Sequence, residues 1–260
     1  MNSKSAAVIE KLLRSKILSK ISTYDPKAEA KPFYIRLFGK ERLTIYSFLH
    51  SVITMLGSSV FEEIGVILLS ENSTHVEKGY MLKGELSTDA LIAADRIITE
   101  LSRKQRVADI SEETKLIRAV AMGAPAREYT MKIDLYFVRD GVENLIEMKT
   151  VKPNVRGFED FKRTMLHWRA VRYRSGSENV RTYIALPYNP MAPEPYDIWQ
   201  LRGVYDLKNE LLVEDEFWTM LGGEGTFEGL LSIFERVGDE VRTLLEEKIG
   251  KLNEPKSTLF

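Results

Sequence analysis

Apolar and polar positions alternate most clearly within residues 133–149, where two runs rich in Val, Ile, Leu, Tyr and Phe flank Asp140 and Gly141. An Asp-Gly dipeptide suits the type I′ turn of a two-residue β-hairpin. Counting outward from that turn places Asp134 directly opposite Glu147, and opposed residues have Cβ atoms roughly 5 Å apart. The pattern therefore predicts a hairpin that brings two carboxylates together.

The rest of the chain shows mainly the helical period of apolar residues. Helices are expected over residues 1–20, 43–61, 88–103 and 111–116, from 157 onward, and over 227–251 as two helices interrupted near Gly238. Ser87 or Thr88 is a suitable N-cap. Residues 181–187 form a compact apolar run that predicts a buried strand, parallel to the hairpin strand before it because a helix connects the two. The glycines of 222–225 follow a helical pattern and predict a helix end, not a nucleotide-binding loop.

One helical segment raises the question of a membrane. Residues 43–61 carry no charge over nineteen positions, which is nearly enough to span a bilayer. The run also contains several Ser and Thr residues and a histidine, and its apolar positions make one helical face. These features favour a buried core helix over a membrane span.

Composition excludes several kinds of chemistry. The 260 residues include no cysteine, so disulfides, thiolate metal sites and cysteine nucleophiles are all excluded. The three histidines, His50, His75 and His167, are too far apart in sequence to suggest a zinc site or a catalytic dyad. With 44% hydrophobic and 29% charged residues the chain has the composition of a soluble globular protein.

Charge is segregated along the chain although the net charge is only −1. Residues 149–174 carry eight basic side chains against two acidic ones, whereas residues 206–254 carry thirteen acids against five bases. A basic stretch beside the hairpin is what contact with a phosphate backbone requires. The alternative is the ordinary solvated face of a helix. The acidic C-terminal part is poorly suited to DNA and could serve a partner or dimer surface.

The hairpin carries the chemistry. Asp134 and Glu147 would repel each other without a positive charge between them, and a hard divalent cation such as Mg²⁺ resolves this conflict. Lys149 shares a face with Glu147 because strand side chains alternate. The chain has seven other acid-x-Lys triplets, but none of them lies across a hairpin from a second acid. The alternative is an exposed hairpin with cross-strand salt bridges that also involve Lys132.

These residues resemble a known motif. Asp134 and Glu147-Met-Lys149 resemble the PD-(D/E)xK nuclease motif, with Ile133 where the motif's name has a proline. The segment 147–154 resembles the TdeIII-type family of type II restriction endonucleases. Further similarity to that family occurs at residues 61–62, 183–190 and 216–223, within an overall span of about 43–238.

The resemblance implies an α/β fold: a restriction-endonuclease-like core in which helices flank a central mixed β-sheet carrying the catalytic hairpin. One domain over 1–260 is expected, with a mainly helical part at 1–125, a catalytic core at 126–200 and a helical part at 201–260. Asp134 and Glu147 would ligate Mg²⁺ together with the Met148 carbonyl. Lys149 would act on the attacking water or the phosphate, and Glu62 would lie near the metal site.

Contacts with double-stranded DNA are expected from residues that follow the hairpin, on the loop, the basic helix and the Pro-rich segment 187–199. They are Lys152, Asn154, Lys162, Arg163, Arg169, Arg172, Tyr188 and Asn189. An ordered surface crossing without a role in DNA binding is the alternative for the Pro-rich segment.

The expected function is Mg²⁺-dependent cleavage of duplex DNA at a short palindrome, and the resemblance implies a GGNCC-type site. A palindrome cut in both strands implies a homodimer. The resemblance also implies a prokaryotic cytoplasmic protein, without a membrane partner, that is accompanied by a protective DNA methyltransferase. A repair or junction-resolving nuclease of the same superfamily and a non-catalytic DNA-binding protein are the alternatives.

Overall fold

The computed structural model of the chain describes residues 1–25, 31–149, 155–196, 201 and 203–253. The chain forms two compact units. The first unit contains Met1–Ile67 and Glu224–Phe260, and the second contains Leu68–Gly223. The unit boundaries therefore bring the first and last parts of the chain together and leave the predicted hairpin inside the second unit.

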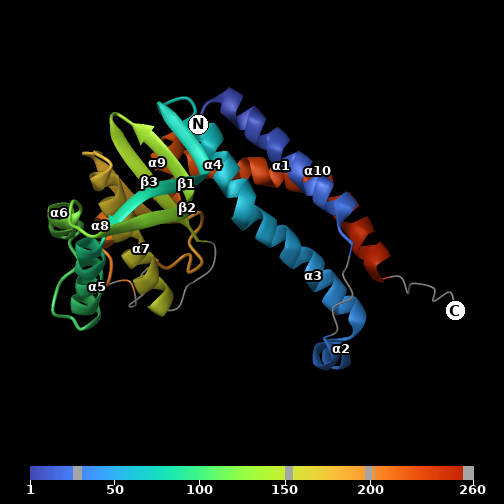
Figure 1. Cartoon of the computed structure of the whole chain (residues 1–260). Coiled ribbons are helices and arrows are strands. Elements are labelled where there is room, and N and C mark those ends of the chain that lie inside the picture. Colours follow the sequence, from blue (N-terminus) through green and yellow to red (C-terminus); the bar gives the residue numbers. More distant parts are fainter. Residues whose placement is uncertain (26–30, 150–154, 197–200, 202, 254–260) are drawn as a thin grey trace. The chain divides into compact units, whose positions relative to one another are not determined.

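The first unit is helical. It comprises α1 (Ser3–Thr23), α2 (Pro32–Phe38), α3 (Lys40–Met55), the π-helical turn η1 (Leu56–Val60), most of α4 (Phe61–Leu69), and α10 (Thr226–Asn253). Helices α1 and α10 lie side by side (Figure 1), and ion pairs join Arg14 to Glu240 and Arg236 to Glu10. At least one acid of the C-terminal part, Glu240, thus forms an ion pair inside this unit.

Helix α10 corrects the prediction of two helices. It is continuous through Gly238, where a break was expected. A glycine inside a helix costs about 1 kcal/mol relative to alanine. Val237 and Val241 are buried on either side of it, and burying such side chains contributes about 1.5–3 kcal/mol each. Packing therefore outweighs the local preference.

The uncharged helix is formed as predicted but is not a core helix. In α3 only Phe48 is buried, while Tyr46 and Ile53 are 63% and 60% exposed. By length and composition the continuous helical stretch Lys40–Leu69 would be able to cross a membrane, and one such helix is weak evidence for a span. The apolar period predicted a buried helical face. Phe48 and Val60 are buried as this prediction requires, whereas Ile53 is exposed.

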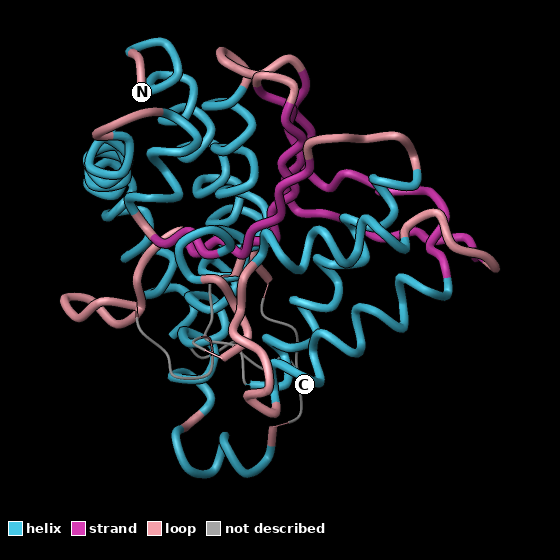
Figure 2. Tube along the Cα trace, turned by 90° about the vertical axis from the view of Figure 1, so that its left-hand side faces the viewer, coloured by secondary structure: helices cyan, strands magenta, loops and turns pink. Residues whose placement is uncertain are grey.

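The second unit is built on a five-stranded mixed sheet, whose strands lie together in Figure 2 (magenta). Its strands are β1 (His75–Ser87), β2 (Ala126–Arg139), β3 (Val142–Met148), β4 (Val180–Leu186) and β5 (Leu211–Val213), in that spatial order. The pairs β1–β2 and β2–β3 are antiparallel, and β3–β4 and β4–β5 are parallel. The predicted α/β class, central mixed sheet and parallel β4 are confirmed.

The hairpin has the predicted turn and register. Asp140 and Gly141 both have positive φ, at 51° and 72°, as a type I′ turn requires. Pairing starts at Arg139 with Val142 and ends at Leu135 with Ile146. The long strand β1, which pairs with β2 on its other side, was not predicted. The consecutive residues Glu77 and Lys78 are both exposed. The strand therefore lacks the regular alternation of apolar and polar positions by which it could have been predicted.

Helices α5 (Thr88–Ser102), α6 (Ile110–Val120) and α7 (Val155–Arg174) are grouped beside the sheet (Figure 1), with α8 (Leu207–Glu210) and α9 (Asp215–Gly222) later in the chain. Ser87 caps α5 by accepting the Ala90 N–H, as predicted. Gly223 ends α9 with φ 85°. Phe158, Met165 and Trp168 of α7 are buried in the main core of this unit.

Candidate active site

Asp134 lies at an opening in the sheet. The β2–β3 pairing stops one residue before it, and the β1–β2 pairing passes from Lys78–Leu135 to Tyr80–Ile133 without it. The carboxylate Oδ2 of Asp134 accepts a hydrogen bond from the Met148 backbone N–H at 2.8 Å. A side chain thus replaces a backbone acceptor at the end of the ladder, and this bond fixes the Asp134 carboxylate beside the end of β3.

Glu147 and Lys149 form an ion pair between Oε1 and Nζ at the same end of β3. Their side chains are only 16% and 22% exposed. Burial raises the pKa of Glu147 above its ordinary value, and the nearby charge of Asp134 raises it further. Lys149 and Lys132 act in the opposite direction. Two carboxylates and a lysine therefore meet here, as the hairpin spacing predicted.

An aromatic ring and a small cavity complete the surroundings. The Lys149 Nζ lies 4.5 Å from the centroid of the Phe161 ring on α7, a cation–π contact. A cavity of about 140 Å³ adjoins Glu147, which is room for several waters. It is lined by Met131, Lys132, Glu147, Phe161, Thr164 and Trp168. Helix α7 thus walls the site that the hairpin carries.

The donor set fits a hard divalent cation. Asp134 and Glu147 offer carboxylate oxygens. The two carboxylates repel each other at a partly buried position, and a cation bound between them would relieve this repulsion. Within the described residues no group of three or more His, Cys, Asp or Glu side chains is arranged so that it could hold a metal ion by itself. A cation held by two carboxylates keeps several waters, as Mg²⁺ usually does. Asp134 and Glu147 would hold the metal, and its expected third protein ligand is the Met148 carbonyl.

Glu62 lies on α4, is 8% exposed and belongs to the first unit. It is therefore a buried acid. Its expected role near the metal stays a prediction.

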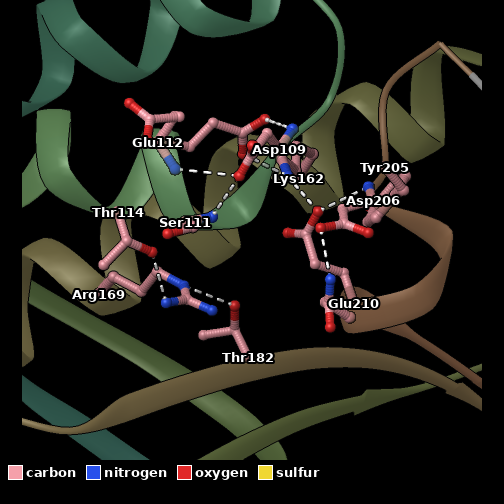
Figure 3. Close-up of polar contacts among 12 residues, drawn as sticks. Asp109, Ser111, Glu112, Thr114, Lys162, Arg169, Thr182, Tyr205, Asp206 and Glu210 are labelled. Carbon is pink, nitrogen blue, oxygen red and sulfur yellow. Dashed lines mark hydrogen bonds and ion pairs between the residues drawn. The ribbon is translucent and has the colours of Figure 1, made fainter.

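The basic face predicted for α7 is corrected at two positions. Lys162 is fully buried and forms ion pairs with Glu113, at 2.5 Å, and with Glu210. Arg169 is 5% exposed and donates to Thr182, Thr114 and the Val180 carbonyl. Figure 3 shows both side chains directed into this polar interior. Neither is available to DNA, because their charges are satisfied inside the fold.

The interior cluster around Lys162 joins three elements. Glu113 comes from α6, Lys162 from α7 and Glu210 from α8. The Lys162 Nζ also lies 5.5 Å from the ring centroid of Tyr205, whose hydroxyl donates to the Phe158 carbonyl at 2.9 Å. Burial raises the pKa of Glu113, and the attraction of Lys162 only partly offsets this. The cluster fixes α7, and with it the wall of the cavity.

The remaining basic candidates on α7 also have acidic partners. Arg163 bonds Asp95 and Asp160 at 2.7 Å each, with its side chain 31% exposed. Arg172 bonds Glu143 through two nitrogens, at 2.6 and 2.8 Å. Phosphate contact by either residue would require exchange of these partners.

The Pro-rich segment was expected to read DNA. Tyr188 is 39% exposed there. The Asn189 side chain instead holds its own loop, since it donates to the Glu194 carbonyl and accepts the Met191 N–H. Lys152 and Asn154 lie outside the described residues, so their expected contacts stay predictions.

Sequence reasoning missed Phe161, Thr164 and Lys132 as parts of the site. Phe161 and Thr164 share a helical face with the core residue Trp168, at a spacing of three and four residues, so the pattern indicated packing alone. Lys132 was considered only as a salt-bridge partner. Its position two residues before Asp134 was the available signal, because such residues share a face of a regular strand.

The family model and the similar proteins that match this chain are all type II restriction enzymes. The family model described as "Type II restriction endonuclease, HinfI" matches residues 1–238. The chain is 24% identical over 225 residues to type II restriction enzyme HgiCII of Herpetosiphon aurantiacus, covering 85% of this chain and 82% of that protein. It is 25% identical over 215 residues to HgiEI of the same organism, covering 81% and 78%. It is 28% identical over 212 residues to MjaII of Methanocaldococcus jannaschii, covering 75% and 55%.

These matches refine the resemblance seen in the motifs. They support a type II restriction enzyme, as expected, but the matched family is that of HinfI and not specifically the TdeIII-type family.

Proposed function

Because this chain belongs to the HinfI family of type II restriction endonucleases, we propose that it uses Mg²⁺ to cleave both strands of DNA at a short palindrome, of the GGNCC type. Members of such a family are site-specific deoxyribonucleases. The single observation that carries the proposed site is the convergence of Asp134, Glu147 and Lys149 at one end of the hairpin. Family membership supports the substrate, and the donor chemistry supports the metal.

Asp134 and Glu147 hold the Mg²⁺ in this proposal. When bound, the metal supplies positive charge where negative charge grows on the phosphate, which is a principal source of rate in phosphoryl transfer. The Met148 N–H orients the Asp134 carboxylate through the 2.8 Å hydrogen bond. Glu62 is proposed to act on the same site.

Lys149 is the residue that handles the water or the phosphate. Its ammonium is held by Glu147 on one side and by the Phe161 ring on the other. It has three N–H donors, so it can hold Glu147 and still donate to a water or to a phosphate oxygen. Water then attacks phosphorus, the bond to the leaving sugar oxygen breaks, and the leaving oxygen takes up a proton.

The proposed partners follow from the substrate. A palindrome presents the same half-site on each strand, so two copies related by a two-fold axis place one hairpin at each strand. A DNA methyltransferase of the same specificity would protect the host DNA. We place the protein in the cytoplasm of a prokaryote.

A digest of a fully sequenced plasmid tests this function directly. Wild-type protein should give discrete bands with Mg²⁺ and none with EDTA, and the band ends give the sequence that is cut. Lys149→Met should abolish the bands. Lys83→Met, which removes an exposed lysine of β1 that does not line the cavity, is the matched control.

Other outcomes identify the alternatives. A smear, or cuts confined to branched DNA, would support a repair or junction-resolving nuclease. Retained DNA binding without any Mg²⁺-dependent cutting would support a non-catalytic DNA-binding protein. Sedimentation of the free protein and of its DNA complex tests the dimer.

A further inference from the structure

Lys132 is a cation at the active-site cavity whose ammonium is not paired with an acid. It is exposed, and it has no hydrogen-bond or ion-pair partner within the part of the chain that the structure describes. It nevertheless lines the cavity together with Glu147. A positive charge that faces a nuclease site without an internal partner is available for the substrate.

Among the described residues, the basic side chains at the end of β3 and on α7 already have acidic or polar partners. Lys149 is paired with Glu147, and Arg172 with Glu143. Lys162 is buried between two glutamates. DNA binding depends on cations that can neutralise phosphates, so the loss of the expected contacts on α7 leaves that role to other residues.

The Lys132 side chain passes close to Gly79. A Cβ built on Gly79 would lie 2.9 Å from the Lys132 Cε and 3.7 Å from its Nζ. Gly79 also has φ +62°, a conformation that side chains rarely adopt. It stands beside Asp134 at the interruption of the β1–β2 ladder. The Lys132 side chain therefore lies across β1 at the level of Asp134.

Lys132 is the cationic side chain of the cavity wall. Phe161 and Trp168 form the apolar side of the wall, and the Thr164 hydroxyl donates to the Asp160 carbonyl. Lys132 brings the ammonium that such a pocket would otherwise lack, since Lys149 is engaged with Glu147. The charge of Lys132 is close enough to Glu147 to favour the ionised carboxylate.

We propose that Lys132 binds a non-bridging oxygen of the DNA phosphate at which the strand is cut. This phosphate-binding position rests on the proposed function, because it presumes DNA as the substrate. It adds to Asp134, Glu147 and Lys149 a residue that contacts the substrate directly. A phosphate held by Lys132 would lie in front of the two carboxylates.

Binding of a fluorescein-labelled duplex of random sequence tests the contact without cleavage. The affinity is measured in EDTA over a series of salt concentrations for wild type, Lys132→Ala, Lys132→Arg and the control Lys83→Ala. Loss of one phosphate contact lowers the slope of log K against log salt by about 0.9. Lys132→Ala should show this decrease, whereas Lys132→Arg and Lys83→Ala should keep the wild-type slope.

Single-turnover cleavage of plasmid DNA with Mg²⁺ then locates the phosphate. Lys132→Ala should cut roughly 10- to 100-fold more slowly than wild type, and Lys132→Arg should recover much of the rate. The melting temperature should change little, because Lys132 is exposed and forms no hydrogen bond or ion pair within the described residues.

The outcomes separate this inference from the function on which it rests. An unchanged salt slope for Lys132→Ala would overturn the contact even if wild type cuts DNA normally. A lower slope with an unchanged cleavage rate would place the contact at another phosphate and overturn the proposed position. If wild type binds duplex but never cuts, the proposed hydrolysis fails while the slope still decides the contact. If wild type does not bind duplex, both fail.

Discussion

The Asp134 carboxylate accepts the backbone N–H of Met148 at 2.8 Å, where the β2–β3 ladder ends. Asp134 therefore has two tasks that substitution can separate: it satisfies a strand end, and it supplies a charged oxygen to the proposed metal site. The amide oxygen of Asn can accept the same hydrogen bond but carries no charge.

Asp134→Asn should keep the fold and lose the activity. We expect its free energy of unfolding to stay within about 0.5 kcal/mol of wild type, with cleavage reduced at least roughly 100-fold because a metal ligand is neutralised. Asp134→Ala should lose activity equally and also cost about 1–3 kcal/mol, since the Met148 N–H of the nearly buried strand end is left unpaired. Urea denaturation and plasmid cleavage measure the two effects. Normal cutting by Asp134→Asn would refute the metal site.

Phe161 should matter for the rate through Lys149. Phe161→Leu keeps an apolar side chain but removes the ring that lies 4.5 Å from the Lys149 ammonium. Such a contact contributes about 0.5–2 kcal/mol, so single-turnover cleavage should slow about 2- to 30-fold with little change in DNA affinity. Phe161→Tyr retains a ring face and should cleave at nearly the wild-type rate. Equal rates for the Leu and Tyr variants would show that the ring does not act on Lys149.

Adjacent residues on α7 provide a matched test of buried and surface ion pairs. Lys162→Met leaves Glu113 and Glu210 in the interior without their cation. Breaking a buried pair from one side costs about 3–5 kcal/mol. Arg163→Met removes pairs to Asp95 and Asp160, whose side chains are 64% and 63% exposed, and should cost below about 1 kcal/mol.

Urea denaturation of both variants checks this difference. Similar stabilities for Lys162→Met and Arg163→Met would mean that the interior cluster is not the anchor of α7. A selective loss in Lys162→Met would also explain why this lysine is unsuited to DNA.

His167 should make stability depend on pH. Burial lowers the pKa of its imidazole from 6.5 to about 4, and its Nε2 has no hydrogen-bond partner in the described structure. The folded state therefore binds fewer protons than the unfolded state between these values. Stability is full above about pH 6.5 and decreases as the pH falls toward 4, by up to about 3 kcal/mol.

The control for this dependence is a second histidine. His167→Gln should flatten the free energy of unfolding between pH 6.5 and 4. His75→Gln changes a side chain that is 51% exposed and should leave the wild-type profile in place. A wild-type profile in His167→Gln would assign the pH dependence to other groups.

The sequence by itself determined the hairpin and its register. An Asp-Gly turn between alternating runs permits only one pairing that keeps the apolar side chains inside, and this placed Asp134 and Glu147 together with Lys149. It also determined α1, α5, α7 and β4, because their periods and caps are local signals. The interruption of the β1–β2 ladder at Asp134 was not visible, because it occurs beside Gly79 in β1, a strand far away in the sequence.

Only the tertiary structure decided which charges are free. Lys162 and Arg163 are neighbours with the same apparent role in the sequence, yet Lys162 is enclosed by glutamates from α6 and α8, whereas Arg163 lies at the surface. Among the described residues that line the cavity, the cation without an ion-pair partner is Lys132, on the hairpin itself. A local pattern can place a side chain on a face, but whether the charge meets a partner or the substrate depends on elements that folding brings there from elsewhere in the chain.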